Sequence, residues 1–319
     1  MQALITGISG QDGSFLAELL LEKDYRVTGL VHGAVAAASL GASEHLRGQV
    51  ELLGGELLAP DSLRAAIVAA EPDELYHLAA PSFIPASWEA PGETVRAIAG
   101  SCAAILEAVR ELAPATRVFV ASSGAIFGEA PESPQREDTP PRPTTPYAIA
   151  KLAAHELVGA LRSHDGLHAS SGVVYNHESE RRPEQFVTRR ITRAAAAISL
   201  GLQSELTLGS LDAVRDWSFA GDVMEGAWLM MQQETPDDYV LASGVARTVR
   251  EFALAAFAVV GLDAERYLRL DSALVRAPEV TPSVGDPTKA AERLGWRPRL
   301  SFEQLVERMV EADVRALRA

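Results

Sequence analysis

Short runs of apolar residues alternate with amphipathic stretches through the first half of the chain. The runs lack polar alternation, which predicts strands buried on both faces, and the stretches have helical spacing. The predicted strands are Ala3–Thr6, Tyr25–Val31, Glu74–Leu78, Arg117–Ser122 and Ala169–Tyr175, and the predicted helices are Gly13–Lys23, Pro60–Ala70, Thr94–Leu112 and Tyr147–His164. This order, with right-handed crossovers, predicts an α/β fold with a Rossmann-like doubly wound parallel sheet.

The second half has a less regular pattern. A stretch rich in Pro and Thr, Glu129–Pro146, predicts a surface loop after a strand end. The helices predicted beyond it are Phe186–Leu202, Ala220–Gln233, Val249–Val260 and Phe302–Leu317, with a short strand at Glu205–Gly209. Because no linker or repeat separates these elements, they predict a smaller, mixed α/β C-terminal lobe woven around the last strands.

Composition and charge restrict the class of protein. Of the 319 residues, 47% are hydrophobic and 23% are charged, as in an ordinary globular protein. The formal net charge of −14 argues against nucleic acid or an anionic membrane as a partner. A single cysteine, Cys102, excludes an internal disulfide, and no apolar run reaches the ~20 residues of a membrane helix. No basic leader and no metal-ligand spacing is present, so we expect a cytoplasmic protein without a metal site.

A glycine-rich turn follows the first predicted strand. Its residues, Gly7-Ile8-Ser9-Gly10-Gln11-Asp12-Gly13, have the spacing GxxGxxG and lead into the first predicted helix. Glycines there permit a tight turn and the close approach of a pyrophosphate, and the free N–H groups at the start of a helix favour an anion. This context predicts a dinucleotide site rather than an ordinary structural turn.

Tyr147 and Lys151 form a YxxxK pattern at the start of a predicted helix. The spacing puts both side chains on one helix face, where an ammonium group favours the phenolate of a neighbouring tyrosine and lets it act as a base. Lys151 is one of only three lysines in the chain. Ser123 lies at the carboxyl end of the preceding strand, where open α/β sheets bind ligands. The three residues predict a site that removes the proton of a sugar hydroxyl.

Taken together, these motifs resemble the extended short-chain dehydrogenases/reductases of the NAD-dependent epimerase/dehydratase superfamily. Nearly the whole chain resembles one family among them, the GDP-mannose 4,6-dehydratases. Five blocks carry this resemblance: TGISGQDGSFLAELLLEK (Thr6–Lys23), YNHESERRPEQFVTRRITRA (Tyr175–Ala194), LGSLDAVRDW (Leu208–Trp217), VLASGVARTVREF (Val240–Phe252) and VGDPTKAAERLGW (Val284–Trp296). The QDGS and NHES signatures within them are specific, because most other members of the superfamily lack them.

The resemblance implies a lyase of nucleotide-sugar metabolism that acts in deoxysugar biosynthesis. In this family NADP takes a hydride from C4 of the hexose of GDP-mannose. The resemblance implies that Tyr147 is the base in this step and that Lys151 lowers the pKa of the tyrosine. An acid/base glutamate then removes the C5 proton and expels the C6 hydroxyl as water, and return of the hydride to C6 gives GDP-4-keto-6-deoxymannose. Ser123 replaces the family's catalytic Thr and keeps its hydroxyl, but the glutamate position is Ala125, which has no proton acceptor.

Ala125 leaves the net reaction open. A general acid/base is worth ~10²–10⁴ in rate, so we expect impaired dehydration unless Glu178 or a water takes over the role. Alternatively, the chain is a GDP-sugar 4-epimerase or a GDP-4-keto-6-deoxy-sugar reductase, or it is a deliberate knock-out of a dehydratase. A hypothesis from another class is an inactive homologue that binds GDP-sugar and dinucleotide; the intact Tyr147 and Lys151 argue against it.

The resemblance also implies the cofactor, NADP, with NAD as the alternative. After the second strand the chain reads Val31-His32-Gly33, which offers neither an Arg pair for a 2′-phosphate nor an acidic residue for ribose hydroxyls. Glu56 stands where the family has an Asp near the adenine. The expected cofactor-binding residues are Gly7, Ser9, Gly10, Gln11, Asp12, Gly13, Glu56, Leu57, Leu78, Ala79, Ala80, Tyr147, Lys151 and His177.

The expected substrate is a GDP-hexose, with GDP-mannose as the family's own. Arginine grips phosphate in a bidentate manner, and the resemblance assigns several arginines to the pyrophosphate and Glu279 to the ribose or base. The expected substrate-binding residues are Ser82, Asn176, Glu178, Val187, Arg190, Gly209, Arg215, Arg276 and Glu279.

Two further expectations concern organisation. We expect residues 1–172 with about 213–248 to form the dinucleotide-binding domain, and about 173–212 with 249–319 to form the nucleotide-sugar-binding lobe. Relatives in the family form dimers or tetramers, so we expect a homodimer or homotetramer, with contacts through Thr94–Leu112 and Tyr147–His164.

Overall fold

A seven-stranded sheet forms the centre of the larger part of the molecule. The computed structural model describes residues 1–35, 38–271 and 281–318. In spatial order the strands are β3 (Glu51–Gly55), β2 (Arg26–His32), β1 (Gln2–Thr6), β4 (Glu74–His77), β5 (Arg117–Ala121), β6 (Ala169–Val174) and β10 (Tyr239–Leu241). Every adjacent pair is parallel, and the order reverses beside β1, so the doubly wound parallel sheet is confirmed.

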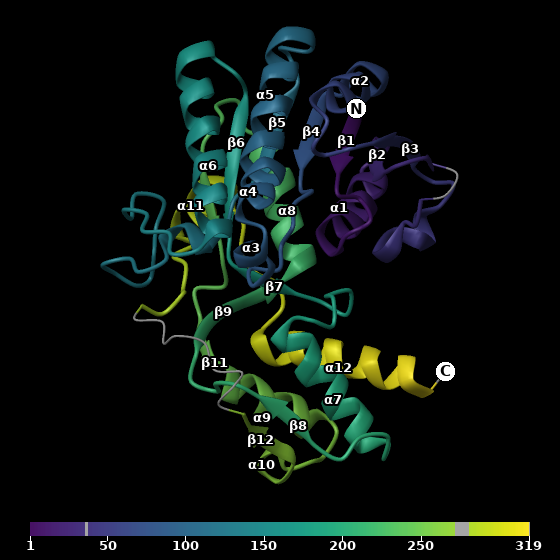
Figure 1. Ribbon diagram of the computed structural model, residues 1–319, viewed down its shortest axis with the longest axis vertical. Coiled ribbons are helices and arrows are strands. Elements are labelled where there is room, and N and C mark those ends of the chain that lie inside the picture. Colours follow the sequence, from purple (N-terminus) through teal and green to yellow (C-terminus); the bar gives the residue numbers. More distant parts are fainter. Residues whose placement is uncertain (36–37, 272–280, 319) are drawn as a thin grey trace.

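Helices cover both faces of this sheet, as a parallel sheet requires. One face carries α2 (Pro60–Ala70), α4 (Pro91–Val95), α5 (Ser101–Leu112) and α6 (Pro146–Asp165), and the other carries α1 (Gln11–Glu22), α8 (Ala220–Met231) and α11 (Thr288–Leu294) (Figure 1). Each layer has its own apolar core. Leu4, Leu75 and Val118 point into one core, and Ala3, Ile5 and Tyr76 point into the other, as alternate residues of a strand do.

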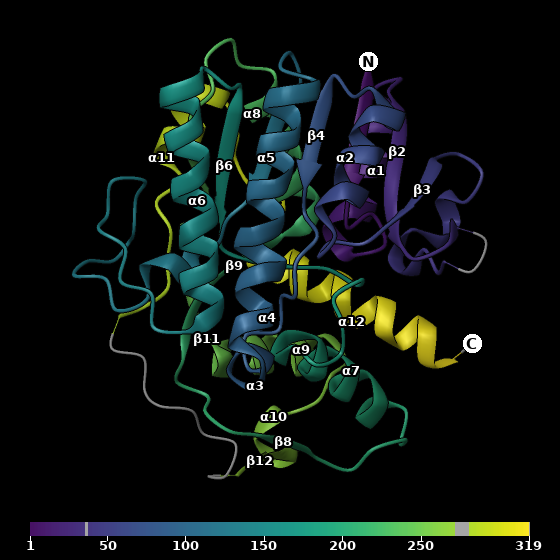
Figure 2. The same cartoon turned by 45° about the horizontal axis from the view of Figure 1, so that its top comes forward.

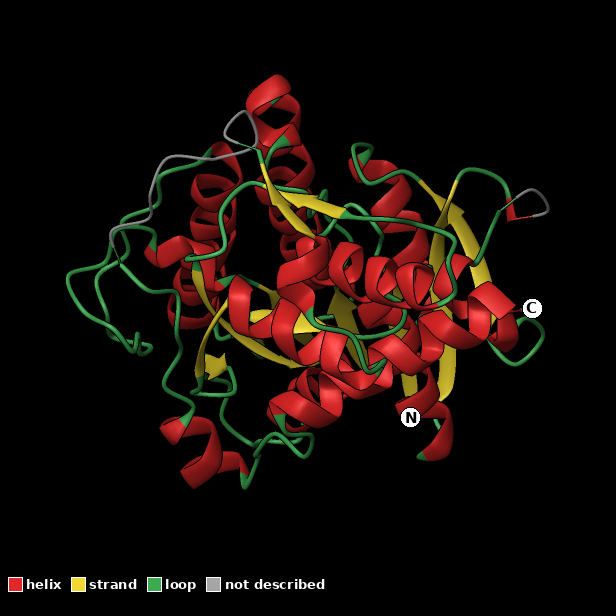
Figure 3. Ribbon diagram, turned by 90° about the horizontal axis from the view of Figure 1, so that it is seen from below, coloured by secondary structure: helices red, strands yellow, loops and turns green. Residues whose placement is uncertain are grey.

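A smaller lobe lies at the carboxyl end of the sheet (Figures 1 and 2). It contains β7 (Asn176–Glu178), β9 (Val214–Phe219) and β11 (Ala246–Thr248) in one sheet, and β8 (Leu206–Leu208) and β12 (Leu268–Leu270) in another. Its helices are α7 (Val187–Ser199), α9 (Val249–Val259), α10 (Ala264–Tyr267) and α12 (Phe302–Arg318). Seen from below, helices lie in front of the strands (Figure 3). The chain crosses between lobes repeatedly, so the smaller lobe is no separate C-terminal unit.

The observed elements depart from the predicted ones in two informative places. The strand β3 was not predicted, because its sequence Glu-Leu-Leu-Gly-Gly has only two apolar side chains before two glycines. A Cβ at Gly54 would lie 2.3 Å from the carbonyl oxygen of Gly33, so packing against the neighbouring loop requires the glycine. The single predicted helix Thr94–Leu112 is wrong in detail: α4 ends at Val95, a π-helical turn spans Arg96–Gly100, and α5 begins at Ser101.

The described residues contain neither a membrane-spanning helix nor a cluster of metal ligands. None of the helices in the described ranges is long and apolar enough to cross a bilayer. The same residues contain no group of three or more His, Cys, Asp or Glu side chains placed to hold a metal ion.

Candidate active site

The glycine-rich turn joins β1 to α1, and its backbone leaves no space for a side chain at Gly7 or Gly13. Gly7 has φ +79°, and a Cβ on it would lie 2.9 Å from the backbone nitrogen of Ala79. A Cβ on Gly13 would lie 2.3 Å from the carbonyl oxygen of Gly7. Gly10 precedes the helix and supplies no side-chain cap, so the helix start keeps backbone N–H groups for an anion. The residues therefore fit the pyrophosphate of a dinucleotide, as a close cradle at a helix N-terminus does.

The turn is held against the end of β4 by a buried hydrogen-bond network. Ser101 donates its hydroxyl to Ala97 O at 2.6 Å, so the contact of 3.1 Å to His77 requires the His77 Nε2–H to donate. Nδ1 of His77 then accepts from the Thr6 hydroxyl at 2.8 Å. The Thr6 oxygen accepts in turn from the N–H groups of Leu78 and Ala79, both at 3.2 Å. This network sets the distance between the turn and the expected cofactor-binding segment Leu78–Ala80.

His77 makes a pH-dependent contribution to stability. Burial, assisted by the charge of Lys151, lowers the pKa of His77 to about 3, from an ordinary 6.5. As the pH falls below 6.5, the His77 imidazole therefore binds a proton in the unfolded chain but stays neutral in the folded protein. Between pH 7 and pH 5 we expect the unfolding free energy to lose about 2 kcal/mol from this residue alone.

Urea unfolding at the two pH values measures this loss. In a His77→Gln variant the pH-dependent component should disappear, although the variant is less stable at pH 7. His164→Gln, which changes a side chain that is 84% exposed, is the matched control and should keep the wild-type pH dependence. An equal loss in wild type and His77→Gln would contradict a buried, neutral His77.

Ser123, Tyr147 and Lys151 come from two adjacent elements at the carboxyl end of the sheet. Ser123 follows β5, and its hydroxyl oxygen accepts from the N–H of Ala125 at 3.2 Å. Tyr147 lies in the first turn of α6, which the side chain of Thr145 caps by accepting from Ala148 N. The Lys151 ammonium donates to Ala121 O at 2.6 Å and lies 5.8 Å from the centre of the Tyr147 ring. The spacing of four thus places the cation next to the phenol.

Ala125 lies in a short 3-10 turn, Gly124–Phe127, directly after Ser123. Its side chain is half-buried and packs against the apolar cluster that includes Tyr147. The carboxylate of Glu178, the alternative acid/base, accepts from the Thr188 hydroxyl at 2.7 Å and pairs with Arg182 at 3.2 Å. Both partners hold the carboxylate in place, so Glu178 is committed to Thr188 and Arg182.

The two signatures QDGS and NHES contact one another. Gln11 donates to His177 O at 3.1 Å and accepts from the Ser179 hydroxyl at 2.7 Å. His177 Nε2 lies 3.0 Å from both carboxylate oxygens of Asp12. Burial raises the pKa of Asp12, but the His177 charge and hydrogen bond prevail and bring it to about 2. Sequence reasoning missed Arg182, which stacks 3.6 Å from the Phe186 ring centre and whose charge also lowers the Asp12 pKa.

The remaining expected cofactor-binding residues lie at the same carboxyl edge of the sheet. Glu56 and Leu57 follow β3, and Leu78, Ala79 and Ala80 follow β4. A carboxylate oxygen of Glu56 lies 3.0 Å from Nδ1 of His32, the last residue of β2. Since β3, β2, β1 and β4 are consecutive in the sheet, these segments lie side by side with the glycine-rich turn.

The expected substrate residues are spread over the smaller lobe and the loops that face it. Val187 opens α7, Arg190 donates to Thr207 O at 2.9 Å, and Gly209 follows β8. Arg190 lines a hollow between α7 and β8 with Glu184, Arg193, Gln203, Glu205 and Thr207. Arg215 lies on β9, where its Nη1 donates to Val214 O at 2.8 Å.

One ring contact brings this lobe to the nucleotide end of the sheet. The rings of Phe83 and Phe186 meet edge to face at 5.8 Å, which joins the Ser82 loop to the start of α7. Asn176 opens β7, beside β9. Arg276 and Glu279 lie outside the described residues.

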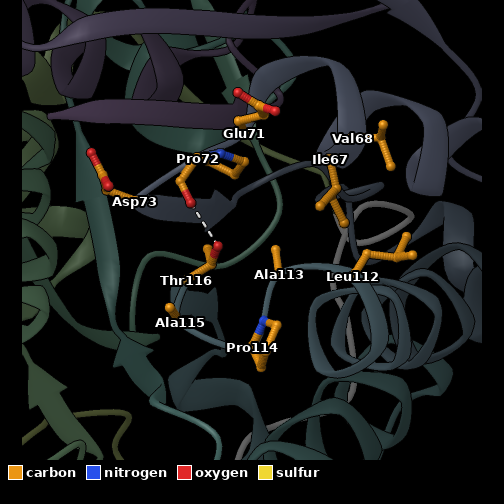
Figure 4. A pocket seen from close by; sticks show the side chains of 10 residues that line it. All are labelled: Ile67, Val68, Glu71, Pro72, Asp73, Leu112, Ala113, Pro114, Ala115 and Thr116. Carbon is orange, nitrogen blue, oxygen red and sulfur yellow. Dashed lines mark hydrogen bonds between the residues drawn. The ribbon is translucent and has the colours of Figure 1, made fainter.

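A second hollow lies at the opposite, amino end of the strands. Figure 4 shows its lining, which includes Ile67, Val68, Leu112 and Pro114, and the hydrogen bond of 2.6 Å from the Thr116 hydroxyl to Pro72 O. Asp73 precedes β4 and Thr116 precedes β5. Ligands of open α/β sheets bind outside the carboxyl ends of the strands, so this hollow is not the candidate active site.

Comparisons with known proteins agree with this geometry. The model of the family described as GDP-mannose 4,6 dehydratase matches residues 4–309. GDP-mannose 4,6 dehydratase 1 of Arabidopsis thaliana is 43% identical, over 98% of this chain and 89% of the relative. GDP-mannose 4,6-dehydratase of Sinorhizobium fredii is 41% identical, over 99% and 97%, and GDP-mannose 4,6 dehydratase of Homo sapiens is 37% identical, over 99% and 92%.

Solved structures share the fold over the full length. A Thermus thermophilus UDP-glucose 4-epimerase, in complex with NAD, superposes with a TM-score of 0.85 at 26% identity, over 98% of this chain and 99% of the other. RMD from Pseudomonas aeruginosa, complexed with NADPH, gives a TM-score of 0.81 at 23% identity, over 99% and 100%. With a family match that spans nearly every element of both lobes, the chain belongs to the GDP-mannose 4,6-dehydratase family.

Proposed function

We propose that this protein is a nicotinamide-dinucleotide-dependent nucleotide-sugar enzyme that oxidises C4 of the mannose of GDP-mannose. The placement of Ser123, Tyr147 and Lys151 at the same carboxyl edge of the sheet as the glycine-rich turn carries this proposal, because it brings a proton acceptor and a dinucleotide cradle to one edge. The family membership supplies the substrate class. The relatives' names describe 4,6-dehydration of GDP-mannose, and the full reaction proposed here gives GDP-4-keto-6-deoxymannose.

Each residue has a distinct part in C4 oxidation. The glycine-rich turn 7–13 would hold the nicotinamide dinucleotide, which would supply the acceptor and donor of the hydride. Tyr147 accepts the proton of the C4 hydroxyl, and the positive charge of Lys151, whose Nζ lies 5.8 Å from the centre of the Tyr147 ring, favours this transfer. Ser123 donates its hydroxyl to the same sugar oxygen and fixes its position, since its own oxygen is already oriented by Ala125 N. Thr145 and the capped start of α6 hold Tyr147 in place.

The site divides between the two parts of the chain. We propose that residues 1–172 with about 213–248 bind the dinucleotide through the turn 7–13, Glu56–Leu57 and Leu78–Ala80, and that His177 on β7 completes this site from the other part. The remainder binds GDP-mannose, with Arg190 near its phosphates and Val187 at the start of α7 near the sugar. Arg215 on β9, within residues 213–248, lies near the same phosphates. The edge-to-face contact of Phe83 with Phe186 supports a substrate between the lobes.

The choice of NADP over NAD rests on the family and not on a group of cations placed to bind the 2′-phosphate. NADP is the proposed cofactor, with NAD as its competitor. His32 ends β2 and contacts Glu56, while Arg47 is held by Glu44 at 2.5 Å, so its charge is already compensated. A 2′-phosphate needs an uncompensated cation, which predicts a weak preference between the two cofactors.

Ala125 supports a second candidate function. Its side chain packs against apolar neighbours, and Glu178, the alternative acid/base, is committed to Arg182 and Thr188. C4 oxidation needs neither of them, whereas elimination of water requires proton removal at C5 and proton delivery at C6. A GDP-sugar 4-epimerase or 4-keto-6-deoxy-sugar reductase uses only the C4 chemistry that the intact residues supply.

One incubation tests these functions. The purified protein is mixed with GDP-mannose and catalytic NADP or NAD, and the sugar nucleotide is followed by mass and by chromatography. Loss of one water supports the dehydratase. An epimer of unchanged mass supports the epimerase, and conversion of a supplied GDP-4-keto-6-deoxymannose with stoichiometric NADPH supports the reductase. No change with any of these substrates refutes the proposed function.

We also propose a homodimer through α4, α5 and α6. Trp88 on α3 (Ala86–Glu89), Val95 and Ile149 are 63%, 41% and 52% exposed, and the contacts of α3, α4 and α6 bring these helices together. Adjacent exposed apolar side chains are typical of a protein interface. A Trp88→Glu, Ile149→Glu double variant should sediment as a monomer, whereas Leu202→Glu, a 64% exposed control on the smaller lobe, should not change the dimer. A double variant that remains dimeric contradicts this interface.

A further inference from the structure

His177 is buried between two acceptors, which fixes its protonation. Its Nδ1 lies 2.7 Å from the carbonyl oxygen of Tyr175, and its Nε2 lies 3.0 Å from both oxygens of the Asp12 carboxylate. A carbonyl and a carboxylate only accept hydrogen bonds, and a neutral imidazole has a single N–H. Both contacts are satisfied at once only by the doubly protonated imidazolium, and the side chain is only 10% exposed, so water does not substitute for either partner.

The His177 imidazolium pairs with the Asp12 carboxylate, which would otherwise repel the phosphates of the cofactor. Asp12 lies in the first turn of α1, where the phosphates of a dinucleotide approach the helix N-terminus. An unpaired carboxylate there repels phosphate and cancels part of the helix dipole. His177 neutralises it at contact distance, and Gln11, through His177 O and Ser179, keeps the turn and β7 together.

We propose that the charged His177 is a positioning residue for dinucleotide binding, so that cofactor affinity falls as the pH rises and the Asp12–His177 ion pair is lost. This inference rests on the proposed function, since it names how the same site is regulated. It goes beyond a role as a cofactor contact, because the effect passes through Asp12.

The charges around His177 give the direction of the pH effect. Burial lowers the pKa of His177, but the Asp12 charge and hydrogen bond outweigh it, and the pKa is raised above 6.5 in spite of the like charge of Arg182. Those two side chains, Asp12 on α1 and Arg182 after β7, are the charged groups of the described residues that act on it. The ion pair is therefore complete below pH 6.5 and is lost as the pH rises through the folded-state pKa.

Direct binding measurements test the proposal without any sugar. Calorimetric titration with NADP, and with NAD in parallel, should give an affinity that falls about tenfold between pH 6 and pH 9 in the wild type, as for loss of one charge-assisted contact. His177→Gln, whose amide is uncharged at every pH, should bind more weakly and without this pH dependence. His45→Gln, which removes a contact to Glu18 further along α1, is the matched control and should keep the wild-type slope.

A second readout follows the ring itself. In the unmodified protein the His177 ring should titrate above 6.5 by NMR, and Asp12→Asn should move its titration to lower pH. A ring that titrates at or below 6.5, or equal pH slopes for wild type and His177→Gln, overturns the inference. Absence of dinucleotide binding at every pH overturns the proposed function as well, so the two failures are distinguishable.

Discussion

A Tyr147→Phe variant is expected to lose about 10²–10⁴-fold in the rate of C4 oxidation while it binds dinucleotide with nearly unchanged affinity. The ring of Tyr147 is buried, at 8% exposure, and phenylalanine keeps its packing in the apolar core. Only the hydroxyl is lost, and with it the proton acceptor that the Lys151 ammonium stabilises. The loss should therefore appear in the chemical step and not in binding or stability.

Rapid mixing of enzyme and oxidised cofactor with GDP-mannose isolates this step, because absorbance of the reduced nicotinamide reports hydride transfer in a single turnover. Tyr267→Phe removes a hydroxyl from the smaller lobe, outside the proposed catalytic group, and is the matched control. A Tyr147→Phe variant that transfers hydride at the wild-type rate would exclude Tyr147 as the base and leave Ser123 or a water to be considered.

The parts of the fold that were predictable from sequence are those with long, continuous patterns. Pro60–Ala70 was placed to the residue, because the sequence supplies a proline at the helix start and apolar residues at helical spacing. The short strands β7, β9 and β11 carry Asn, Asp, Arg and His side chains and have no such pattern. They form because they pair with one another across distant parts of the chain, a tertiary effect that local sequence does not encode.

The candidate site divides in the same way. The glycine-rich turn and YxxxK were predictable, since each needs particular residues at fixed spacing on one local element. The network of Thr6, His77 and Ser101 joins residues from three elements, and the sequence carries no sign that their hydroxyls and ring meet. His77 is a buried core residue whose two ring nitrogens are both hydrogen-bonded. Arg182 lies in the family block Tyr175–Ala194, but its contacts with Glu178 and Phe186 depend on the fold.

The surroundings of Ala125 indicate how the site responds to the missing carboxylate. The N–H of Ala125 donates to Ser123, and this bond sets the backbone of the 3-10 turn whatever the side chain at 125. The side chain is half-buried, on a turn that follows the Ser123 strand end and contacts α6. A longer side chain therefore starts from an unchanged backbone, and what the position lacks is the chemistry of a proton acceptor.

Ala125→Glu is accordingly expected to raise the rate of water loss from GDP-mannose by about 10²–10⁴-fold and to leave C4 oxidation within a few-fold of the wild type. The carboxylate supplies the proton acceptor for C5 and, once protonated, the donor that assists departure of the C6 hydroxyl. Mass analysis of the product measures dehydration, and single-turnover reduction of the cofactor measures oxidation in the same samples. Ala125→Gln matches the size of glutamate without its acid/base chemistry, so a gain in Glu alone assigns the effect to proton transfer. Equal dehydration by the wild type and the Glu variant would instead mean that another group already performs this step, and Glu178→Gln would then be the variant that abolishes it.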